Sequence, residues 1–418
     1  MRYLQQWNSR QQRKSSAGLK SRSRQRKKMN GAGKKVVVVT NSSSYEPRAE
    51  WVGELFKQQG AQVLWVETDF IHREKVKKVR SAPDHMYIDT VPYRKNLSVR
   101  RLYSQYDFAR KAEKILEKEQ ADMVYMILPA NSLAAAGDRI KRKMNRAVLV
   151  FDILDLWPES LGGKKLQKLW PFQCWRRLRD DHLKAADLVI TECHYFQKFI
   201  NAKQEKTAVV YWPKEVPEGW KMEAPENEAP ETPAVIHFAY LGSINNIIDI
   251  DGIVNFLEIT GKMTPVFLHV VGDGENRGLF EEKLKSKGIK AEFYGAVYEE
   301  AVKAEIFSRC MFGINMMKPG VCVGLTMKSI DYFCYGLPLV NNIPGDTWEL
   351  VKQEQIGINY RPDAALKCAQ ELLALAQSGR IKAIKYKMQS LYMKLFTQEA
   401  AENVIRERVF PLLEGGPK

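Results

Sequence analysis

The chain has 418 residues, of which 45% are hydrophobic, so it is long enough for two domains with buried cores and too apolar to be disordered throughout. Its formal net charge of +16 would suit a nucleic-acid-binding protein, but residues 1–35 hold twelve Lys/Arg and no Asp/Glu, which leaves 53 basic against 49 acidic residues elsewhere. The excess charge is mostly a tail, which argues against nucleic acid as a partner of the folded part.

Residues 1–34 form a basic tail rich in Ser, Arg, Gln and Lys. Such a segment cannot pack, so we expect it to be disordered and dispensable, although an arm that binds RNA or anionic lipid stays open. It lacks the apolar core of a secretion signal. No apolar run approaches the roughly 18 residues of a membrane span. The six cysteines show no metal or disulfide spacing, which favours a reduced, cytoplasmic protein.

The ordered part begins with a valine-rich run over residues 35–41 that is typical of a buried parallel strand. A serine-rich loop, a helix and a second strand complete a βαβ unit by residue 66. Residues 35–212 therefore predict a doubly wound α/β domain of about six strands. The later strands are expected over residues 123–128, 147–152, 188–191 and 208–211.

Two acids follow the strand that ends near Asp152. Asp155 and Glu159 should lie at the carboxyl edge of the sheet, where open α/β folds place their chemistry. Each acid, taken alone, is equally well explained as a turn-former or a helix cap. We keep both as candidate catalytic residues.

The segment over residues 164–179 places aromatic residues among six basic ones and contains no acid. Trp170, Trp175, Arg176 and Arg177 would suit contact with an acceptor or an anionic membrane. Packing of these aromatics on the core is nearly as good an explanation, and a nucleic-acid face is a weaker one.

Residues 213–233 are rich in Pro and Glu without periodicity, which predicts an interdomain linker. Residues 234–395 repeat the alternation of strands and helices, so we expect a second doubly wound domain that faces the first across a cleft. Its strands are expected over residues 234–240, 266–271, 291–293 and 311–315. A last helix within residues 396–418 could cross back to the first domain.

A glycine-containing loop over residues 317–324 runs into a helix that carries Lys328 and Asp331 about one turn apart. Free amides and the positive end of a helix dipole favour an anion there, and Lys328 would reinforce them. Asp331 could accept hydrogen bonds from sugar hydroxyls. A surface ion pair is the plainer interpretation of the same two residues. The loop and helix together suggest a sugar-nucleotide site.

The chain resembles GT-B glycosyltransferases of family 4, of the bacterial capsular and exopolysaccharide type. The resemblance to their donor domain lies in residues 240–244, 270–274, 293–297 and above all 328–340. Residues 155–160 resemble the acceptor domain of the surface-polysaccharide members. The resemblance covers roughly residues 35–400. It implies two Rossmann-like domains and a retaining transfer from a nucleoside-diphosphate sugar to a lipid-linked glycan, in the cytoplasm at the inner face of the membrane, without a metal or other cofactor.

The resemblance also implies roles for single residues. Lys328 would meet the diphosphate and Asp331 the ribose hydroxyls. The amides of Gly320, Val321 and Gly324 would approach the phosphates and the donor sugar. Gly295 and Tyr298 would approach the base, with Gly242, Ser243 and Gly272 in the same donor site. Asp155 and Glu159 are the candidates for acceptor contact or for the base.

Two features of the family are absent. Residues 243–249 carry no Arg or Lys to grip the diphosphate, and Val323 stands where an acid is usual. A non-catalytic GT-B subunit that binds a glycan or a partner therefore stays open as an alternative. A sugar-nucleotide 2-epimerase on the same fold is a weaker alternative, because it would need further acids and a catalytic histidine that we do not find.

Overall fold

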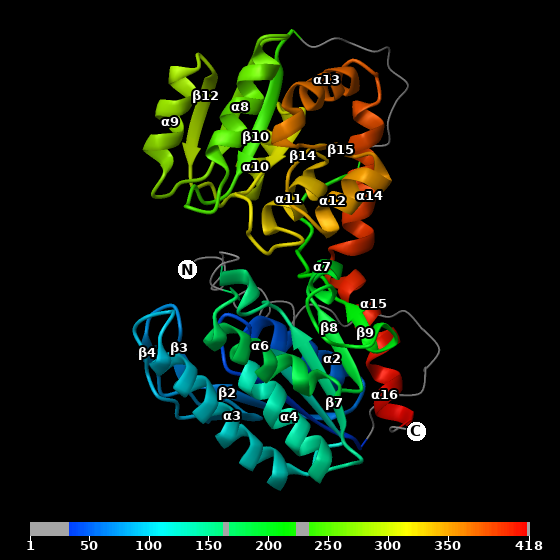
Figure 1. The fold of residues 1–418 in the computed structure, drawn as a ribbon. Coiled ribbons are helices and arrows are strands. Elements are labelled where there is room, and N and C mark those ends of the chain that lie inside the picture. The colour runs from blue at the N-terminus through cyan, green and yellow to red at the C-terminus, as the bar shows by residue number, and fades with distance from the viewer. Residues whose placement is uncertain (1–32, 162–166, 223–233, 416–418) are drawn as a thin grey trace, which may run out of the picture.

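The computed structural model describes residues 33–161, 167–222 and 234–415, which form two α/β domains placed end to end (Figure 1). Each domain has a parallel sheet with helices on both faces, as the alternating patterns predict. Most of the basic tail, residues 164–166 of the basic aromatic segment and residues 223–233 of the linker lie outside the described residues. Among the described residues, no helix is long and apolar enough to cross a membrane.

The N-terminal sheet has seven parallel strands in the order β5-β2-β1-β6-β7-β8-β9. The strands are β1 (Lys35–Thr40), β2 (Gln62–Thr68), β5 (His85–Ile88), β6 (Met123–Leu128), β7 (Val148–Ile153), β8 (Leu188–Thr191) and β9 (Thr207–Val209). In β1, Val37 and Val39 pack in the core on one face, while Val36 and Val38 pack in the core on the other. The strand order reverses between β1 and β6, which makes their carboxyl ends a topological switch point.

Helices cover both faces of this sheet. They are α2 (Glu46–Gln58), α3 (Val99–Glu119), α4 (Asn131–Lys143), η1 (Glu159–Leu161), α6 (Trp170–Leu183), α7 (His194–Gln197) and η2 (Gln204–Lys206). Phe108 of α3 and Leu133 of α4 pack on one face, and Phe56 of α2 packs on the other. A small hairpin of β3 (Phe70–Ile71) and β4 (Val76–Lys77) follows β2.

The C-terminal sheet has six parallel strands in the order β12-β11-β10-β13-β14-β15. The strands are β10 (Ile236–Leu241), β11 (Val266–Val271), β12 (Lys290–Gly295), β13 (Phe312–Asn315), β14 (Leu339–Asn341) and β15 (Gly357–Asn359). The helices are α8 (Ile250–Gly261), α9 (Arg277–Ser286), α10 (Glu300–Ser308), α11 (Met327–Tyr335), α12 (Asp346–Glu354), η3 (Pro362–Ala364), α13 (Ala365–Ala376) and α14 (Ile381–Leu395). Here the order reverses between β10 and β13.

The chain crosses back to the first domain at its end (Figure 1). After α14, helices α15 (Gln398–Arg408) and α16 (Phe410–Gly415) pack on the N-terminal sheet. The ring centroids of Phe410 and Phe56 are 5.4 Å apart, and Arg408 Nη2 donates to the carbonyl of Thr207 at 2.9 Å. The last helices therefore tie the two domains together.

The largest differences from the sequence-based prediction are short elements. The strands β5 and β15, the β3–β4 hairpin and helix α12 were not expected, and the N-terminal sheet has seven strands instead of about six. Strand β15 has only three residues, and β4 has only two, both exposed, so neither has a hydrophobic pattern of useful length. The single last helix expected within residues 396–418 is two helices, which divide at Val409, two residues before Pro411.

Candidate active site

The switch point of the C-terminal sheet is surrounded by the loops after β10 and β13 and by the start of α11. Gly242, the first residue after β10, donates its amide to the carbonyl of Val271 at 2.9 Å. A Cβ on Gly272 would lie 1.9 Å from the Gly242 carbonyl oxygen, so only glycine lets these two loops come this close. Gly242 and Gly272 therefore present main chain at the edge where the donor was expected.

Helix α11 begins at this edge under a capping box. Thr326 Oγ1 accepts a hydrogen bond from the amide of Ser329 at 3.2 Å, and Ser329 Oγ accepts one from the amide of Thr326 at 3.1 Å. The cap uses the Ser329 amide, so an anion here would rely on amides of the preceding loop and of the first two helical residues. The positive end of the helix dipole still favours that anion.

Lys328, in the first turn of α11, is a buried cation without a partner. The residue is 8% exposed, and its Nζ makes no hydrogen bond within the described part of the chain. The ammonium lies 4.8 Å from the centroid of the Tyr240 ring on β10. Burial lowers the pKa of Lys328 to about 7. An anion bound at this edge would supply the partner that the protein does not.

Asp331, one turn further along α11, has a partner from outside the sheet. Its carboxylate pairs with Lys214 Nζ, and both side chains are largely buried. Lys214 is held in turn by the last helices, because its amide donates to the carbonyl of Phe396 at 2.8 Å. Asp331 thus contacts Lys214 of the linker, whereas Lys328 contacts Tyr240 of β10. That Asp331 accepts hydrogen bonds from ribose hydroxyls stays a prediction.

The loop between β13 and α11 packs against the N-terminal domain. Cys322 belongs to the hydrophobic core of that domain. A Cβ on Gly324 would lie 2.5 Å from Tyr195 Cβ and 2.9 Å from Cys193 Sγ, so glycine is needed for this contact between the domains. Gly320 has a φ of 91° with open space around it, and Val321 beside it is partly exposed. The predicted approach of these amides to phosphate is not tested by the contacts.

Asp346 at the start of α12 fixes the same contact from the other side. Its carboxylate accepts from the amides of His194 and Tyr195, both at 2.8 Å, and from the Tyr211 hydroxyl at 2.9 Å. The residues that follow β8 in the first domain are therefore held against the loop that leads to Lys328. The carboxyl edges of both sheets meet at one place.

The two acids predicted in the N-terminal domain lie at this edge but in different surroundings. Asp155 accepts from the Ser160 hydroxyl at 2.7 Å and from the Trp157 indole, and burial raises its pKa. Glu159 is 2% exposed and is bound by two arginines: Arg179 Nη2 and Arg176 Nε each lie 2.9 Å from its Oε1. Glu159 is thus charge-neutralised, whereas Asp155 has no cation paired with it among the described residues.

Glu192, the first residue after β8, is an acid that the sequence pattern did not single out. Its carboxylate forms no hydrogen bond with any described residue, and the residue keeps partial exposure. Desolvation, followed by the charge of Asp155, raises the pKa of Glu192 to about 8. Because Glu192 directly precedes Cys193, which meets Gly324, it lies beside the contact between the domains.

The basic aromatic segment divides between surface and core. Trp170 is 75% exposed at the start of α6, and Arg177 is exposed. The Trp175 ring lies edge-on to that of Trp157 at 5.4 Å, and Arg176 pairs with Glu159. Only part of the segment is therefore available to a membrane or an acceptor.

The remaining predicted donor residues lie around the same sheet edge. Ser243 is exposed, and its carbonyl accepts from the Tyr240 hydroxyl at 3.0 Å. Gly295 has a φ of 70°, a Cβ added to it would meet open space, and it bridges to Gly272. Tyr298 is 65% exposed. Their contact with a base stays a prediction.

Three residues of the site were missed, two of them because their partners are far away in sequence. Lys214 pairs across 117 positions and Asp346 across 152. Glu192 is a single acid after a four-residue strand. The only available signal was position: Glu192 follows an expected strand, where carboxyl-edge residues gather.

Comparisons with known proteins support the fold. No family model matches the chain, and no curated protein sequence matches it. Among solved structures, the chain is similar to the apo form of the lipopolysaccharide outer core galactosyltransferase WaaB, with 15% identity, a TM-score of 0.63 and coverage of 90% of this chain and 99% of that one. It is also similar to Anabaena HepE in complex with UDP (13%, TM-score 0.62, 90% and 100%) and to the pneumococcal O-GlcNAc transferase GtfA in complex with UDP and GlcNAc (11%, TM-score 0.53, 91% and 99%). The predicted GT-B fold is confirmed.

Proposed function

We propose that the chain is a glycosyltransferase of family 4 that moves a sugar from a nucleoside-diphosphate sugar to a glycan acceptor. The observation that carries the proposal is Lys328, a buried cation without a partner at the switch point of the C-terminal sheet. A diphosphate between Gly242 and the loop over residues 320–324 would pair with this cation and with nearby amides. The structures similar to this one include complexes with UDP, which supports a nucleotide sugar as the donor.

In the proposed reaction, the bond between the anomeric carbon and the β-phosphate oxygen breaks while the acceptor oxygen bonds to that carbon. The leaving diphosphate gains negative charge, and Lys328 and the loop amides would stabilise it. Because this charge grows toward the transition state, their contribution should appear in the rate as well as in binding. We propose retention of configuration and no need for a metal, so chelation with EDTA should leave the transfer rate unchanged.

The acceptor hydroxyl has to lose its proton in this reaction. We assign Asp155 and Glu192 to receive it, because they lie at the carboxyl edge of the first domain and Glu159 is already bound by two arginines. Burial, followed by the charge of Asp155, raises the pKa of Glu192 to about 8, which makes its ionised carboxylate a stronger base than an ordinary one. Glu192→Gln should lower kcat by about 10²- to 10⁴-fold with little change in donor affinity. An unchanged kcat would remove Glu192 from the mechanism.

A thermal-shift screen with UDP, GDP, dTDP and their sugars tests the donor site. At least one nucleotide should raise the melting temperature of the wild-type protein, and Lys328→Gln should abolish that shift. Lys303→Gln is the matched control, since Lys303 is a second buried lysine of the same domain but pairs with Glu300 at 2.5 Å. If no nucleotide shifts the wild-type protein and no donor is turned over, the result favours a non-catalytic GT-B subunit.

We further propose that the acceptor is lipid-linked and that the protein works in the cytoplasm at the membrane face, in capsule or exopolysaccharide synthesis. The exposed Trp170 and Arg177 on α6 support a peripheral membrane contact. Trp170→Ala with Arg177→Glu should release the protein from anionic vesicles in a flotation assay. The same assay with Arg73→Glu, an exposed arginine on another loop, is the control, and equal release by both variants would contradict a specific membrane face.

A further inference from the structure

Arg101, in the first turn of α3, is a second buried cation that lacks a carboxylate partner. The residue is 9% exposed, and its Nε is buried without a hydrogen-bond partner. Nη1 donates to the carbonyl of Asn96 at 2.9 Å, and the guanidinium lies 4.0 Å from the centroid of the Trp157 ring. Trp157 also donates to Asp155, so Arg101 lies next to the acceptor edge of the first domain.

Lys75, in the β3–β4 hairpin, adds a second positive charge at this place. Its Nζ lies 5.0 Å from the centroid of the Tyr93 ring and donates to Asn96 Oδ1 at 2.5 Å. Arg101 contacts the same Tyr93 ring at 5.6 Å. Lys75 has a φ of 59°, a left-handed conformation that is uncommon for a lysine, so the hairpin holds it at some conformational cost.

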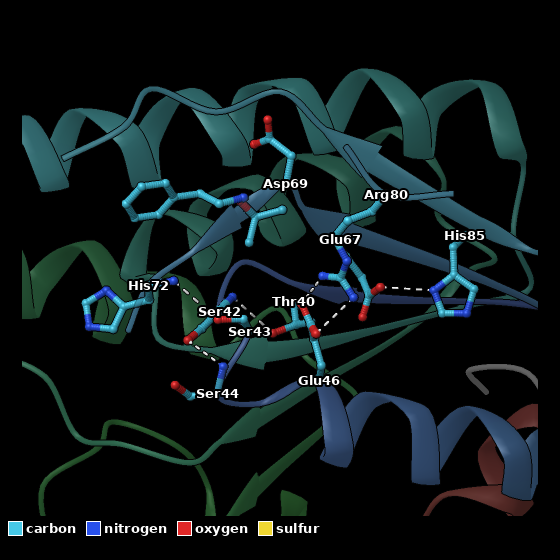
Figure 2. Close-up of polar contacts among 12 residues, drawn as sticks. Thr40, Ser42, Ser43, Ser44, Glu46, Glu67, Asp69, His72, Arg80 and His85 are labelled. Carbon is cyan, nitrogen blue, oxygen red and sulfur yellow. Dashed lines mark hydrogen bonds and ion pairs between the residues drawn. The ribbon is translucent and has the colours of Figure 1, made fainter. Parts of the chain in front are cut away.

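His72 connects the two cations to the loop after β1. Its Nδ1 lies 2.6 Å from the Tyr93 hydroxyl and 3.2 Å from Lys75 Nζ. Its amide donates to Ser43 Oγ at 3.3 Å, and Figure 2 shows His72 beside Ser43 and Ser44. Burial, followed by the charges of Arg101 and Lys75, lowers the pKa of His72 to about 4. These groups are hydrogen-bond donors and acceptors around the cations, and none is an acid.

The acids nearby in the fold are engaged elsewhere. Glu67 pairs with His85 at 2.9 Å (Figure 2), and Asp69 lies 3.5 Å from Lys77. Glu74 pairs with Lys78 at 2.8 Å. Asp155 is the acid that acts on Arg101, and its own hydrogen bonds come from Trp157 and Ser160. Arg101 and Lys75 are therefore free to pair with the negative charge of a ligand.

We propose that Arg101, Lys75, His72 and Ser43 form a site for a phosphate group carried by the acceptor. Two cations without a carboxylate partner match the two negative charges of a phosphate monoester or of a diphosphate that joins a lipid to a glycan, and a planar guanidinium can bind two phosphate oxygens at once. The phosphate could belong to a soluble sugar phosphate or to the lipid of a lipid-linked glycan. Assigning this phosphate to the acceptor rests on the proposed function, whereas phosphate binding at this site does not.

Calorimetric titration of the full chain with glucose 6-phosphate and with farnesyl phosphate tests the site. The titration is done with UDP present, to fill the donor site, and again in Lys328→Gln, so that it does not depend on whether the donor site works. At least one of the two phosphates should bind, and which one binds identifies the source. Arg101→Gln and Lys75→Gln should each weaken this binding by about tenfold or more, while the thermal shift by UDP stays as in the wild-type protein.

Lys78→Gln is the matched control, because Lys78 is a lysine of the same hairpin that already has an acid, and phosphate binding should not change. Lys75 is only partly buried, so its variant keeps the test meaningful if Arg101→Gln fails to fold. The proposal is overturned if neither phosphate binds the wild-type protein at millimolar concentration, or if glucuronate or glucose binds equally well. It is also overturned if Lys78→Gln weakens binding as much as Lys75→Gln.

Discussion

Each domain has a buried cation whose surroundings contrast with those of the other: Arg48 in the N-terminal domain has an acidic partner, and Lys328 in the C-terminal domain has none among the described residues. Arg48 of α2 is 2% exposed, and its Nε donates to Asp152 Oδ2 at 2.9 Å; Asp152 also accepts from the Tyr125 hydroxyl at 2.6 Å. Lys328 of α11 is 8% exposed and has only the face of the Tyr240 ring beside it.

The difference separates a structural charge from a functional one. Burial disfavours both cations, but Asp152 outweighs it for Arg48, whose pKa is raised, whereas nothing does so for Lys328, whose pKa falls to about 7. A buried charge that is paired within the protein, such as that of Arg48, helps to stabilise the folded state. A charge that the fold leaves alone destabilises the free protein and gains a partner when an anion binds.

The largest expected effect comes from breaking the satisfied pair. Arg48→Met leaves Asp152 buried and charged, so it should lower the free energy of unfolding by about 3–5 kcal/mol, measured by urea denaturation. The double variant Arg48→Met with Asp152→Leu removes both charges and should recover most of that loss. If the double variant is as unstable as the single one, the pair is not what holds this part of the core.

The same substitution at the unsatisfied cation should act in the opposite direction. Lys328→Met removes a charge that burial disfavours, so it should raise the free energy of unfolding of the free protein by about 1–3 kcal/mol. It should also abolish the thermal shift by nucleotides. A loss of stability similar to that of Arg48→Met would mean that Lys328 has a structural role, and the comparison would fail.

The sequence predicted the strands and the two charged residues of α11, but not which residues these charges contact. Strands β6 and β11 have the predicted bounds because their apolar runs are continuous and are followed by a strand breaker, Pro129 after β6 and Gly272 after β11. Lys328 and Asp331 were found because a lysine and an acid stand one turn apart after a glycine-rich loop. Their separate environments were not visible, since Lys214 is 117 positions from Asp331 and only the fold brings them together.

The acids of the first domain show the same limit. Asp155 and Glu159 were placed at a strand end by pattern alone, and the structure confirms that position. Glu159 is bound by Arg176 and Arg179, and this contact depends on which face of α6 packs on the domain. The aromatic residues of that helix are only half-buried, so their pattern did not predict the buried face. Glu192 was missed because a lone acid after a short strand has no pattern in the sequence.

A pH series sharpens the comparison further. Lys328 has a pKa of about 7 in the folded protein and an ordinary value of 10.5, so above pH 7 the unfolded chain binds more protons at this residue than the folded one. The free energy of unfolding of the wild-type protein relative to Lys328→Met should therefore rise between pH 7 and 8.5, by up to about 1.4 kcal/mol per pH unit. A difference that is independent of pH would contradict the lowered pKa.

The lowered pKa of Lys328 also predicts that protons are taken up when the donor binds. An anion beside Lys328 favours its charged form, so donor binding at pH 8 should take up about one proton. Calorimetry of UDP-glucose binding in buffers of different ionisation enthalpy measures this number, because the sugar nucleotide itself does not titrate near neutral pH. Lys328→Arg, which stays protonated, is the control and should bind without proton uptake.

The smallest expected effect concerns the ion pair of Lys214 and Asp331, which is less buried than that of Arg48 and Asp152. It tests whether the burial of an ion pair determines how much the pair contributes to the free energy of unfolding. The side chains of Lys214 and Asp331 are 18% and 14% exposed, so water screens them more than it screens Arg48 and Asp152. Lys214→Met should lower the free energy of unfolding by only about 0.5–1 kcal/mol in urea denaturation. It also releases Asp331, so nucleotide affinity should hold or rise if Asp331 contacts the ribose, and fall if Lys214 orients that carboxylate. A loss of stability as large as that of Arg48→Met would show that the link between the domains, and not burial alone, decides what a buried charge pair contributes.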